Sequence, residues 1–158
     1  MAPGLEPRND SAAPPRSVLF ICGMNAIRSP MAEVLAKALL PSGTYIASAG
    51  VKTGERDPFV DVVLDELGLN AGRHEPHTLE QLEDDYFDLI VTLAPEAHHT
   101  ALELTRSLAV EVEYWQTADP TATTGTREQI VSAYRDVRDH LENLIRHRLL
   151  GQSPHKMP

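Results

Sequence analysis

The feature that most constrains this chain is an apolar run that ends in a loop and leads directly into a helix pattern. It extends from Val18 to Pro30 and reads VLFICGMNAIRSP. The segment Ser17–Cys22 is nearly all apolar, which is typical of a central strand covered on both faces. Ser29 is expected to be the N-cap of the helix, with Pro30 as its first residue. The helix pattern that follows has apolar residues at i, i+3 and i+4 spacing: Met31, Val34, Leu35, Ala38 and Leu39.

The loop between this strand and this helix is suited to hold a doubly charged oxyanion. Backbone N–H groups of a tight loop and of a first helical turn point at one spot, and the helix dipole adds positive charge. Arg28 can close the cradle as a planar, bidentate fork. Cys22, the only cysteine of the chain, stands at the end of the strand, where a positive field favours the nucleophilic thiolate. We therefore predict an active site, in preference to a buried structural cysteine beside a surface arginine.

The rest of the chain alternates between strand and helix patterns. Further strands are predicted at 44–49, 87–93 and 110–115, and further helices begin at Asp57-Pro58, at Pro95 (over 95–108) and at Thr126. The last strand alternates valine and glutamate, which predicts a half-exposed edge strand. These patterns predict an α/β fold with a four-stranded parallel sheet in the order 2-1-3-4 and helices on both faces. The loop after the first strand then lies at the switch point where ligands bind.

Composition limits the organisation and the partners of the chain. Its 158 residues predict one domain at 17–150, preceded by a proline-rich disordered leader at 1–16 and followed by a frayed tail at 151–158. A net charge of −9 argues against nucleic acid and against anionic membranes as partners. One cysteine excludes an internal disulfide and a cysteine-only metal cluster. Without a long apolar segment or a signal peptide pattern, a cytoplasmic location is expected.

Release of a leaving oxygen requires a proton donor, and two Asp-Pro pairs compete for this role. Asp57 directly precedes a helix pattern, so its simplest role is an N-cap. Asp119 lies in a loop that follows the carboxyl end of the predicted edge strand, and has no evident structural role. Such loops gather on the ligand-binding side of a parallel sheet. We therefore favour Asp119 as the general acid.

The stretch from Cys22 to Pro30 resembles the C-x₅-R-S-P signature of the low-molecular-weight protein tyrosine phosphatase family, which includes thioredoxin-coupled arsenate reductases. The resemblance implies a flavodoxin-like three-layer sandwich and hydrolysis of phosphomonoesters through a phosphocysteine, without a cofactor. It also places a general acid in a late Asp-Pro pair, which Asp119 matches, and makes Ser48 and His74 hydrogen-bonding partners of Asn25. The implied phosphate-binding loop comprises Gly23, Met24, Asn25, Ala26, Ile27, Arg28 and Ser29.

The sequence also departs from the family pattern, and this bears on the substrate. Met24 replaces a common glycine, the loops at 51–56 and after Pro120 lack aromatic residues, and Ile27 replaces a second cysteine. The expected substrate is a phosphorylated protein or a small phosphomonoester, with arsenate as a phosphate-like ligand. The alternatives are an arsenate reductase-like enzyme that needs an external thiol and a catalytically weak oxyanion-binding module. The pairs His74/His77 and His98/His99 do not converge, so no metal site is expected.

Overall fold

The computed structural model describes residues 15–24, 26–72, 74–82, 86–106 and 108–152, so most of the predicted leader and tail lie outside it. Four parallel strands form one sheet in the order β2-β1-β3-β4, which confirms the predicted topology. The strands are β1 (Ser17–Cys22), β2 (Tyr45–Gly50), β3 (Leu89–Thr92) and β4 (Glu111–Tyr114). The helices are α1 (Arg28–Leu39), α2 (Pro58–Asp65), α3 (Pro95–Leu104) and α4 (Arg127–Leu144), with short turns η1 (Leu79–Gln81), η2 (Pro120–Ala122) and the π-helical η3 (Ile145–Leu149).

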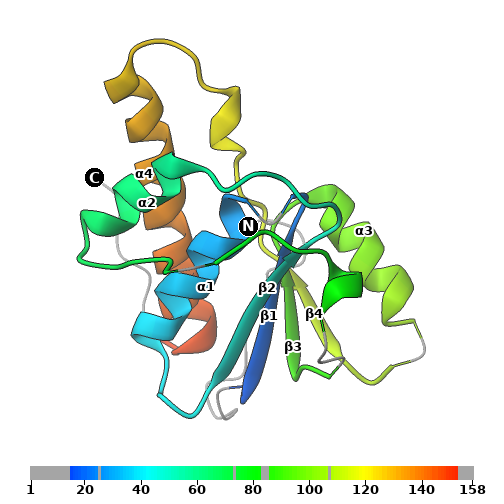
Figure 1. Cartoon of the computed structure of the whole chain (residues 1–158). Helices are drawn as coiled ribbons and strands as arrows, with labels where there is room; N and C mark the ends of the chain where they lie inside the picture. Colours follow the sequence, from blue (N-terminus) through cyan, green and yellow to red (C-terminus); the bar gives the residue numbers. More distant parts are fainter. Residues whose placement is uncertain (1–14, 25, 73, 83–85, 107, 153–158) are drawn as a thin grey trace.

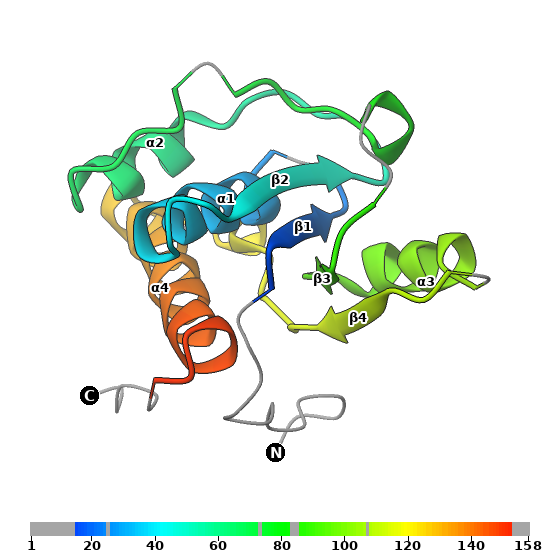
Figure 2. The ribbon, with the colours of Figure 1, turned by 90° about the horizontal axis from the view of Figure 1, so that it is seen from below.

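The helices cover the two faces of the sheet unequally, in a flavodoxin-like three-layer arrangement (Figures 1 and 2). Helices α1, α2 and α4 lie on one side and α3 lies on the other. Side chains of β1 alternate between the two layers. Phe20 and Cys22 belong to the core shared with α1 and α4, whereas Leu19 and Ile21 belong to the core beneath α3. Because β1 is buried on both faces, its apolar run is continuous rather than alternating.

Local capping signals set most of the helix starts. Asp57 accepts a hydrogen bond from the Phe59 amide, and Thr126 forms a capping box with Gln129, as their sequence contexts predict. The expected N-cap at Ser29 is wrong, because α1 already begins at Arg28 and Ser29 lies inside its first turn. Helix α3 ends at Leu104, earlier than its predicted end at 108. None of the helices in the described ranges combines the length and the apolar character needed to cross a lipid bilayer.

Strand β4 is the predicted edge strand, but its alternating valines and glutamates do not place both glutamates in solvent. Glu111 is exposed, whereas Glu113 is buried and faces the C-terminal turn. There its Oε1 accepts hydrogen bonds from Arg148 Nε at 3.0 Å and from Trp115 Nε1 at 3.0 Å. The side chains of Arg148 and Glu113 are only 5% and 6% exposed. This buried ion pair fixes the end of the chain against the edge of the sheet.

We predict that Arg148→Met destabilises the protein by about 3–5 kcal/mol, because it removes the guanidinium that faces the buried Glu113 carboxylate. The measurement is the free energy of unfolding in urea. Arg106→Met is the matched control, since Arg106 pairs with Glu103 at side-chain exposures of 75% and 53% and such a pair contributes less than about 1 kcal/mol. Equal effects of the two substitutions would contradict a structural role for the buried pair.

Candidate active site

The carboxyl end of β1 opens into a small pocket of about 210 Å³. It lies at the switch point of the sheet, because β1 has β2 on one side and β3 on the other. The three predicted catalytic residues line it together. The described residues that line it are Cys22, Met24, Ala26, Ile27, Arg28, Gly54, Glu55, Asp57, Asp119 and Thr121. No aromatic side chain is among these lining residues, in agreement with the aromatic-poor loops of the sequence.

Cys22 ends β1 and lies beneath the first turn of α1. Its Sγ lies 2.9 Å from the hydroxyl oxygen of Ser29 and accepts a hydrogen bond from the Ser29 amide at 3.4 Å. The Ser29 hydroxyl is also 3.3 Å from the Ala49 carbonyl oxygen, to which it donates. A thiolate can only accept, so ionisation of Cys22 makes the Ser29 hydroxyl its donor. Ser29 thus contacts the sulfur with both its amide and its hydroxyl instead of capping the helix.

The loop after Cys22 is held from two sides. The Val51 amide donates to the Cys22 carbonyl at 3.1 Å, and the Lys52 amide donates to the Gly23 carbonyl at 2.8 Å. On the α3 side, a Cβ at Gly23 would lie 2.6 Å from Oε1 of Glu96, so glycine leaves room for this carboxylate. These contacts tie the start of the loop to β2 and place it beside α3.

Met24 forms part of the pocket wall and rests on Gly54. A Cβ at Gly54 would lie 3.1 Å from Cε and 3.3 Å from Cβ of Met24, which is tighter than an ordinary contact. The absence of a side chain at Gly54 therefore makes room for Met24. Half of the Met24 surface remains exposed at the pocket mouth.

Arg28 connects the start of α1 with the segment that follows β4. Its Nη1 donates to the carbonyl oxygen of Thr117 at 3.1 Å, although the two residues are 89 positions apart. Thr117 belongs to the segment after β4 that also carries Asp119. Because a guanidinium has five N–H donors, this bond leaves others for an anion in the pocket.

Asp119 lines the pocket and also caps η2, a structural role that sequence reasoning missed. Its Oδ1 accepts hydrogen bonds from the Thr121 hydroxyl at 2.6 Å and from the Thr121 amide at 3.0 Å. Partial burial by itself raises the pKa of Asp119, but the hydrogen bonds from Thr121 and the charge of Arg28 outweigh burial, so the pKa lies below its ordinary value. Asp119 is therefore ionised at neutral pH.

Asp57 lines the same pocket, so position alone does not separate the two aspartates. Its Oδ1 accepts from the Phe59 amide at 2.8 Å, and its Oδ2 accepts from the Tyr134 hydroxyl at 2.7 Å. Burial and the charge of Asp57 raise the pKa of Tyr134 above its ordinary value, so the phenol stays protonated and keeps donating. Both oxygens of Asp57 are thus engaged, whereas only Oδ1 of Asp119 accepts a hydrogen bond from a described residue.

Ser48 and His74 are brought together by a residue that sequence reasoning missed, Glu33 of α1. The Ser48 hydroxyl donates to Glu33 Oε1 at 2.5 Å, and His74 Nδ1 lies 3.9 Å from the same oxygen. Glu33 follows Ser29 by four positions and so lies on the same helix face, a spacing that could have indicated it. Asn25 lies outside the described residues, so the expected contacts of Ser48 and His74 with Asn25 stay a prediction.

Comparison with known proteins points to one family. The sequence profile described as "Low molecular weight phosphotyrosine protein phosphatase" matches residues 17–152. The glutaredoxin arsenate reductase of Synechocystis sp. is 27% identical over 135 residues, which cover 82% of this chain and 96% of that protein. An arsenate reductase of Halalkalibacterium halodurans is 30% identical over 129 residues, covering 82% and 91%. The crystal structure of the Erwinia amylovora tyrosine phosphatase amsI superposes with a TM-score of 0.72 at 25% identity, covering 94% of this chain and 99% of that one.

We predict that Thr121→Val raises the pKa of Asp119, because it removes the hydroxyl donor that stabilises the carboxylate. The measurement is a ¹³C NMR titration of the Asp119 carboxyl group. Thr121→Ser retains a hydroxyl and should keep the pKa low. Thr123→Val, a threonine in the same loop that does not contact Asp119, is the control and should also leave it unchanged. An unshifted pKa in Thr121→Val would show that this hydroxyl does not stabilise the carboxylate.

Proposed function

Because the chain belongs to the low molecular weight phosphotyrosine protein phosphatase family, we propose that it is a cysteine-dependent hydrolase of phosphomonoesters. The observation that carries this proposal is the contact of Cys22 Sγ with the amide and hydroxyl of Ser29, beneath the N-terminus of α1. Both Ser29 groups can donate hydrogen bonds to the sulfur, and the helix dipole attracts the phosphate dianion to the same point. Arg28 and Asp119 line the pocket into which this sulfur opens.

The proposed reaction has two steps. In the first, the Cys22 thiolate attacks phosphorus in line with the leaving oxygen, while Arg28 and the N–H groups of the loop bind the three equatorial oxygens. Asp119 gives its proton to the leaving oxygen, and a phosphocysteine forms. In the second step, Asp119 takes a proton from a water molecule that attacks phosphorus, and Cys22 leaves as a thiolate that Ser29 stabilises.

The lowered pKa of Asp119 suits the second step, in which the carboxylate acts as a base. For the first step the carboxyl group must hold a proton, which a bound phosphate favours because its negative charge raises the pKa of a nearby acid. The acid form of a carboxyl group is populated below its pKa and lost above it. Turnover should therefore be highest below neutral pH and decrease as pH rises.

We predict that Cys22→Ser abolishes hydrolysis of para-nitrophenyl phosphate and that Asp119→Asn lowers kcat about 10²–10⁴-fold. The measurement is steady-state kinetics between about pH 5 and 8, where wild-type kcat/KM should fall with pH and the Asp119→Asn profile should be flat. The loss in Asp119→Asn should be larger on phenyl phosphate, whose leaving group needs protonation more.

Asp65→Asn is the matched control, because Asp65 is an exposed aspartate at the end of α2 that does not line the pocket. It should keep the wild-type rate and pH profile. A wild-type rate that does not change with pH would count against a carboxyl group as the acid, and undiminished turnover in Cys22→Ser would exclude the sulfur as nucleophile.

A second candidate function is reduction of arsenate, favoured by the curated relatives that are named arsenate reductases. The pocket that binds phosphate would bind arsenate in the same way. Reduction to arsenite requires two electrons, and with one cysteine the chain cannot form an internal disulfide. An external thiol must therefore attack the sulfur of a Cys22–arsenate adduct, release arsenite and leave a mixed disulfide, which a second external thiol reduces.

For this second function we predict arsenite formation only when glutathione and glutaredoxin are both supplied with arsenate. Mass spectrometry of the intermediate should show one glutathione on Cys22, and Cys22→Ser should form neither product. The measurement is arsenite release with and without the thiol system. The absence of arsenite under both conditions would remove this candidate and leave the phosphatase proposal untouched.

A further inference from the structure

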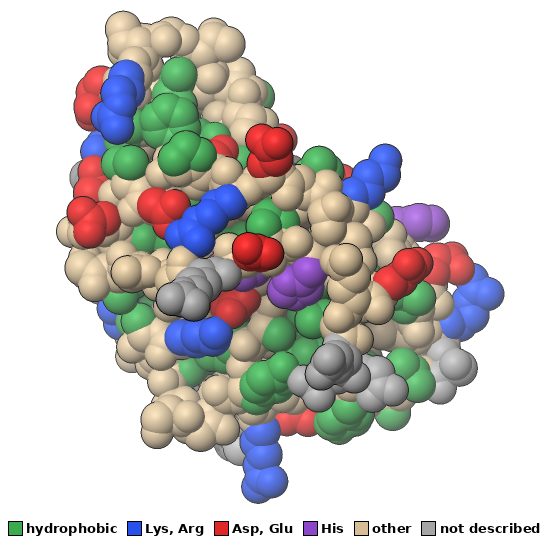
Figure 3. Space-filling view, in the orientation of Figure 1, with side chains coloured by type: hydrophobic (Ala, Val, Ile, Leu, Met, Phe, Trp, Pro, Cys, Tyr) green, Lys and Arg blue, Asp and Glu red, His purple; other side chains and the backbone are tan. Residues whose placement is uncertain are grey.

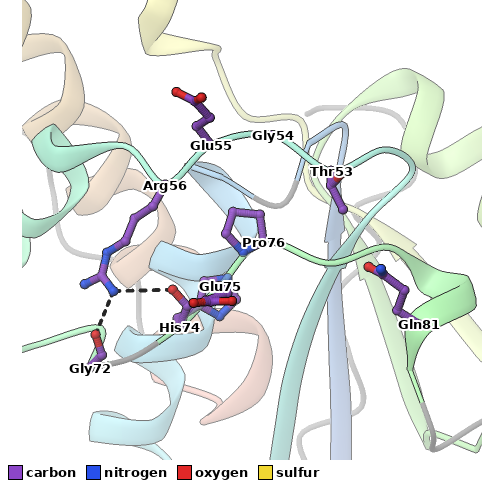
Figure 4. Close-up of a pocket in the computed structure, with 9 residues that line it drawn as sticks. All are labelled: Thr53, Gly54, Glu55, Arg56, Gly72, His74, Glu75, Pro76 and Gln81. Atoms are coloured by element: carbon purple, nitrogen blue, oxygen red, sulfur yellow. Dashed lines mark hydrogen bonds between the residues drawn. The ribbon is translucent and has the colours of Figure 1, made fainter.

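A second and larger cavity, of about 730 Å³, lies beside the catalytic pocket. Gly54 and Glu55 line both cavities, so the two are separated only by the segment 53–56. We call this second cavity the side groove. The residues that line it are Thr53, Gly54, Glu55, Arg56, Gly72, His74, Glu75, Pro76 and Gln81 (Figure 4). Its volume lies in the size range of cavities that bind ligands, whereas the volume of the catalytic pocket, about 210 Å³, lies below this range.

The two walls of the side groove are held together by hydrogen bonds from Arg56. Arg56 Nη1 donates to the carbonyl oxygens of Gly72 at 2.7 Å and of His74 at 3.3 Å (Figure 4). The rest of its guanidinium is engaged by Asp61, through Nε at 3.3 Å and Nη2 at 2.8 Å. The positive charge of Arg56 is thus neutralised by Asp61 and holds the segment 53–56 against the backbone of Gly72 and His74.

The carboxylates of the side groove, in contrast, have no basic partner among the described residues. Glu55 and Glu75 are both exposed, and within the described part of the chain neither forms an ion pair with a lysine, arginine or histidine. Figure 4 shows Glu55 on one side of the segment 53–56 and Glu75 on the other. Glu55 lines both cavities, and Glu75 lines only the side groove. On this face of the molecule basic side chains are separated by acidic ones (Figure 3), and the chain as a whole carries a charge of −9.

We propose that the side groove binds the polypeptide next to a phosphorylated residue, and that Glu55 and Glu75 select substrates with lysine or arginine in that position. This inference rests on the proposed phosphatase function. The site has a cationic centre at Arg28 for the phosphate and an anionic wall beyond Gly54 for the flanking chain. A phosphopeptide with an adjacent basic residue has the complementary order of charges. The wall-forming role of Arg56 leaves Glu55 and Glu75 as the groups that discriminate between substrates.

The test compares two phosphopeptides that differ only in flanking lysines or norleucines, which have similar chain lengths but different charge. For the wild type, kcat/KM should be about tenfold higher for the lysine peptide, since an exposed ion pair contributes about a two- to fivefold effect and two carboxylates act together. Glu55→Gln and Glu75→Gln should each reduce this ratio, and the double variant should bring it to about one. The charge reversal Glu55→Lys with Glu75→Lys should favour glutamate-flanked peptides.

Glu80→Gln is the matched control, because Glu80 is an exposed glutamate on η1 that does not line the groove. It should keep the wild-type ratio, and the ratio itself should fall with added salt. Because the readout is a ratio, it does not depend on the absolute rate of a variant.

Hydrolysis of para-nitrophenyl phosphate distinguishes the two proposals. If the wild type hydrolyses it through Cys22 but does not prefer the lysine peptide, or does not act on phosphopeptides, the inference about the groove is wrong and the phosphatase proposal stands. The same holds if the double glutamine variant keeps the preference. If the wild type hydrolyses neither para-nitrophenyl phosphate nor the peptides, the phosphatase proposal itself fails.

Discussion

The site depends on one junction, where the carboxyl end of β1 meets the N-terminus of α1. Cys22 closes the strand and Ser29 lies in the first turn of the helix, and the 2.9 Å contact between their side chains joins the two elements. Strand β1 is central and buried on both faces, so its last residue, Cys22, is held within the core at the base of the pocket. A helix N-terminus directed at a fixed sulfur provides positive potential and hydrogen-bond donors together. The core of the sheet therefore fixes the position of the Cys22 sulfur.

The opposite wall of the site is formed by the segment that follows β4, the strand at the other edge of the sheet from β2. Strand β4 is fixed by the buried contact of Glu113 with Arg148, and the segment after it carries Thr117 and Asp119. The bond from Arg28 to the Thr117 carbonyl then connects that segment to the start of α1. A charged pair in the core is costly to desolvate, and its geometry is correspondingly specific. The position of Asp119 thus depends on contacts far from the sulfur.

The pair Asp57 and Asp119 shows how environment separates two similar residues. Each aspartate directly precedes a proline, each caps a helical turn, and each lines the pocket at the end of β1. They differ in the second carboxylate oxygen. Oδ2 of Asp57 accepts a hydrogen bond from the Tyr134 hydroxyl, whereas Oδ2 of Asp119 accepts none from a described residue. The same pocket wall then continues over Gly54 into the side groove, so the chemistry and the proposed recognition of the substrate share a single short segment.

The sequence by itself determined the elements whose signals are local. Periodicity, capping chemistry and the rule for switch points predicted the bounds of β1, the sheet order and the caps at Asp57 and Thr126. They also predicted that Cys22, Arg28 and Asp119 lie together in one pocket. Only the tertiary structure decided the rest, because the partners are distant in sequence. The alternation of β4 could not show that Glu113 points inward, since its partner Arg148 comes 35 residues later. Likewise, the Ser48 hydroxyl meets Glu33 only when α1 packs on β2, and the walls of the side groove are joined by Arg56 and Gly72, which are 16 residues apart.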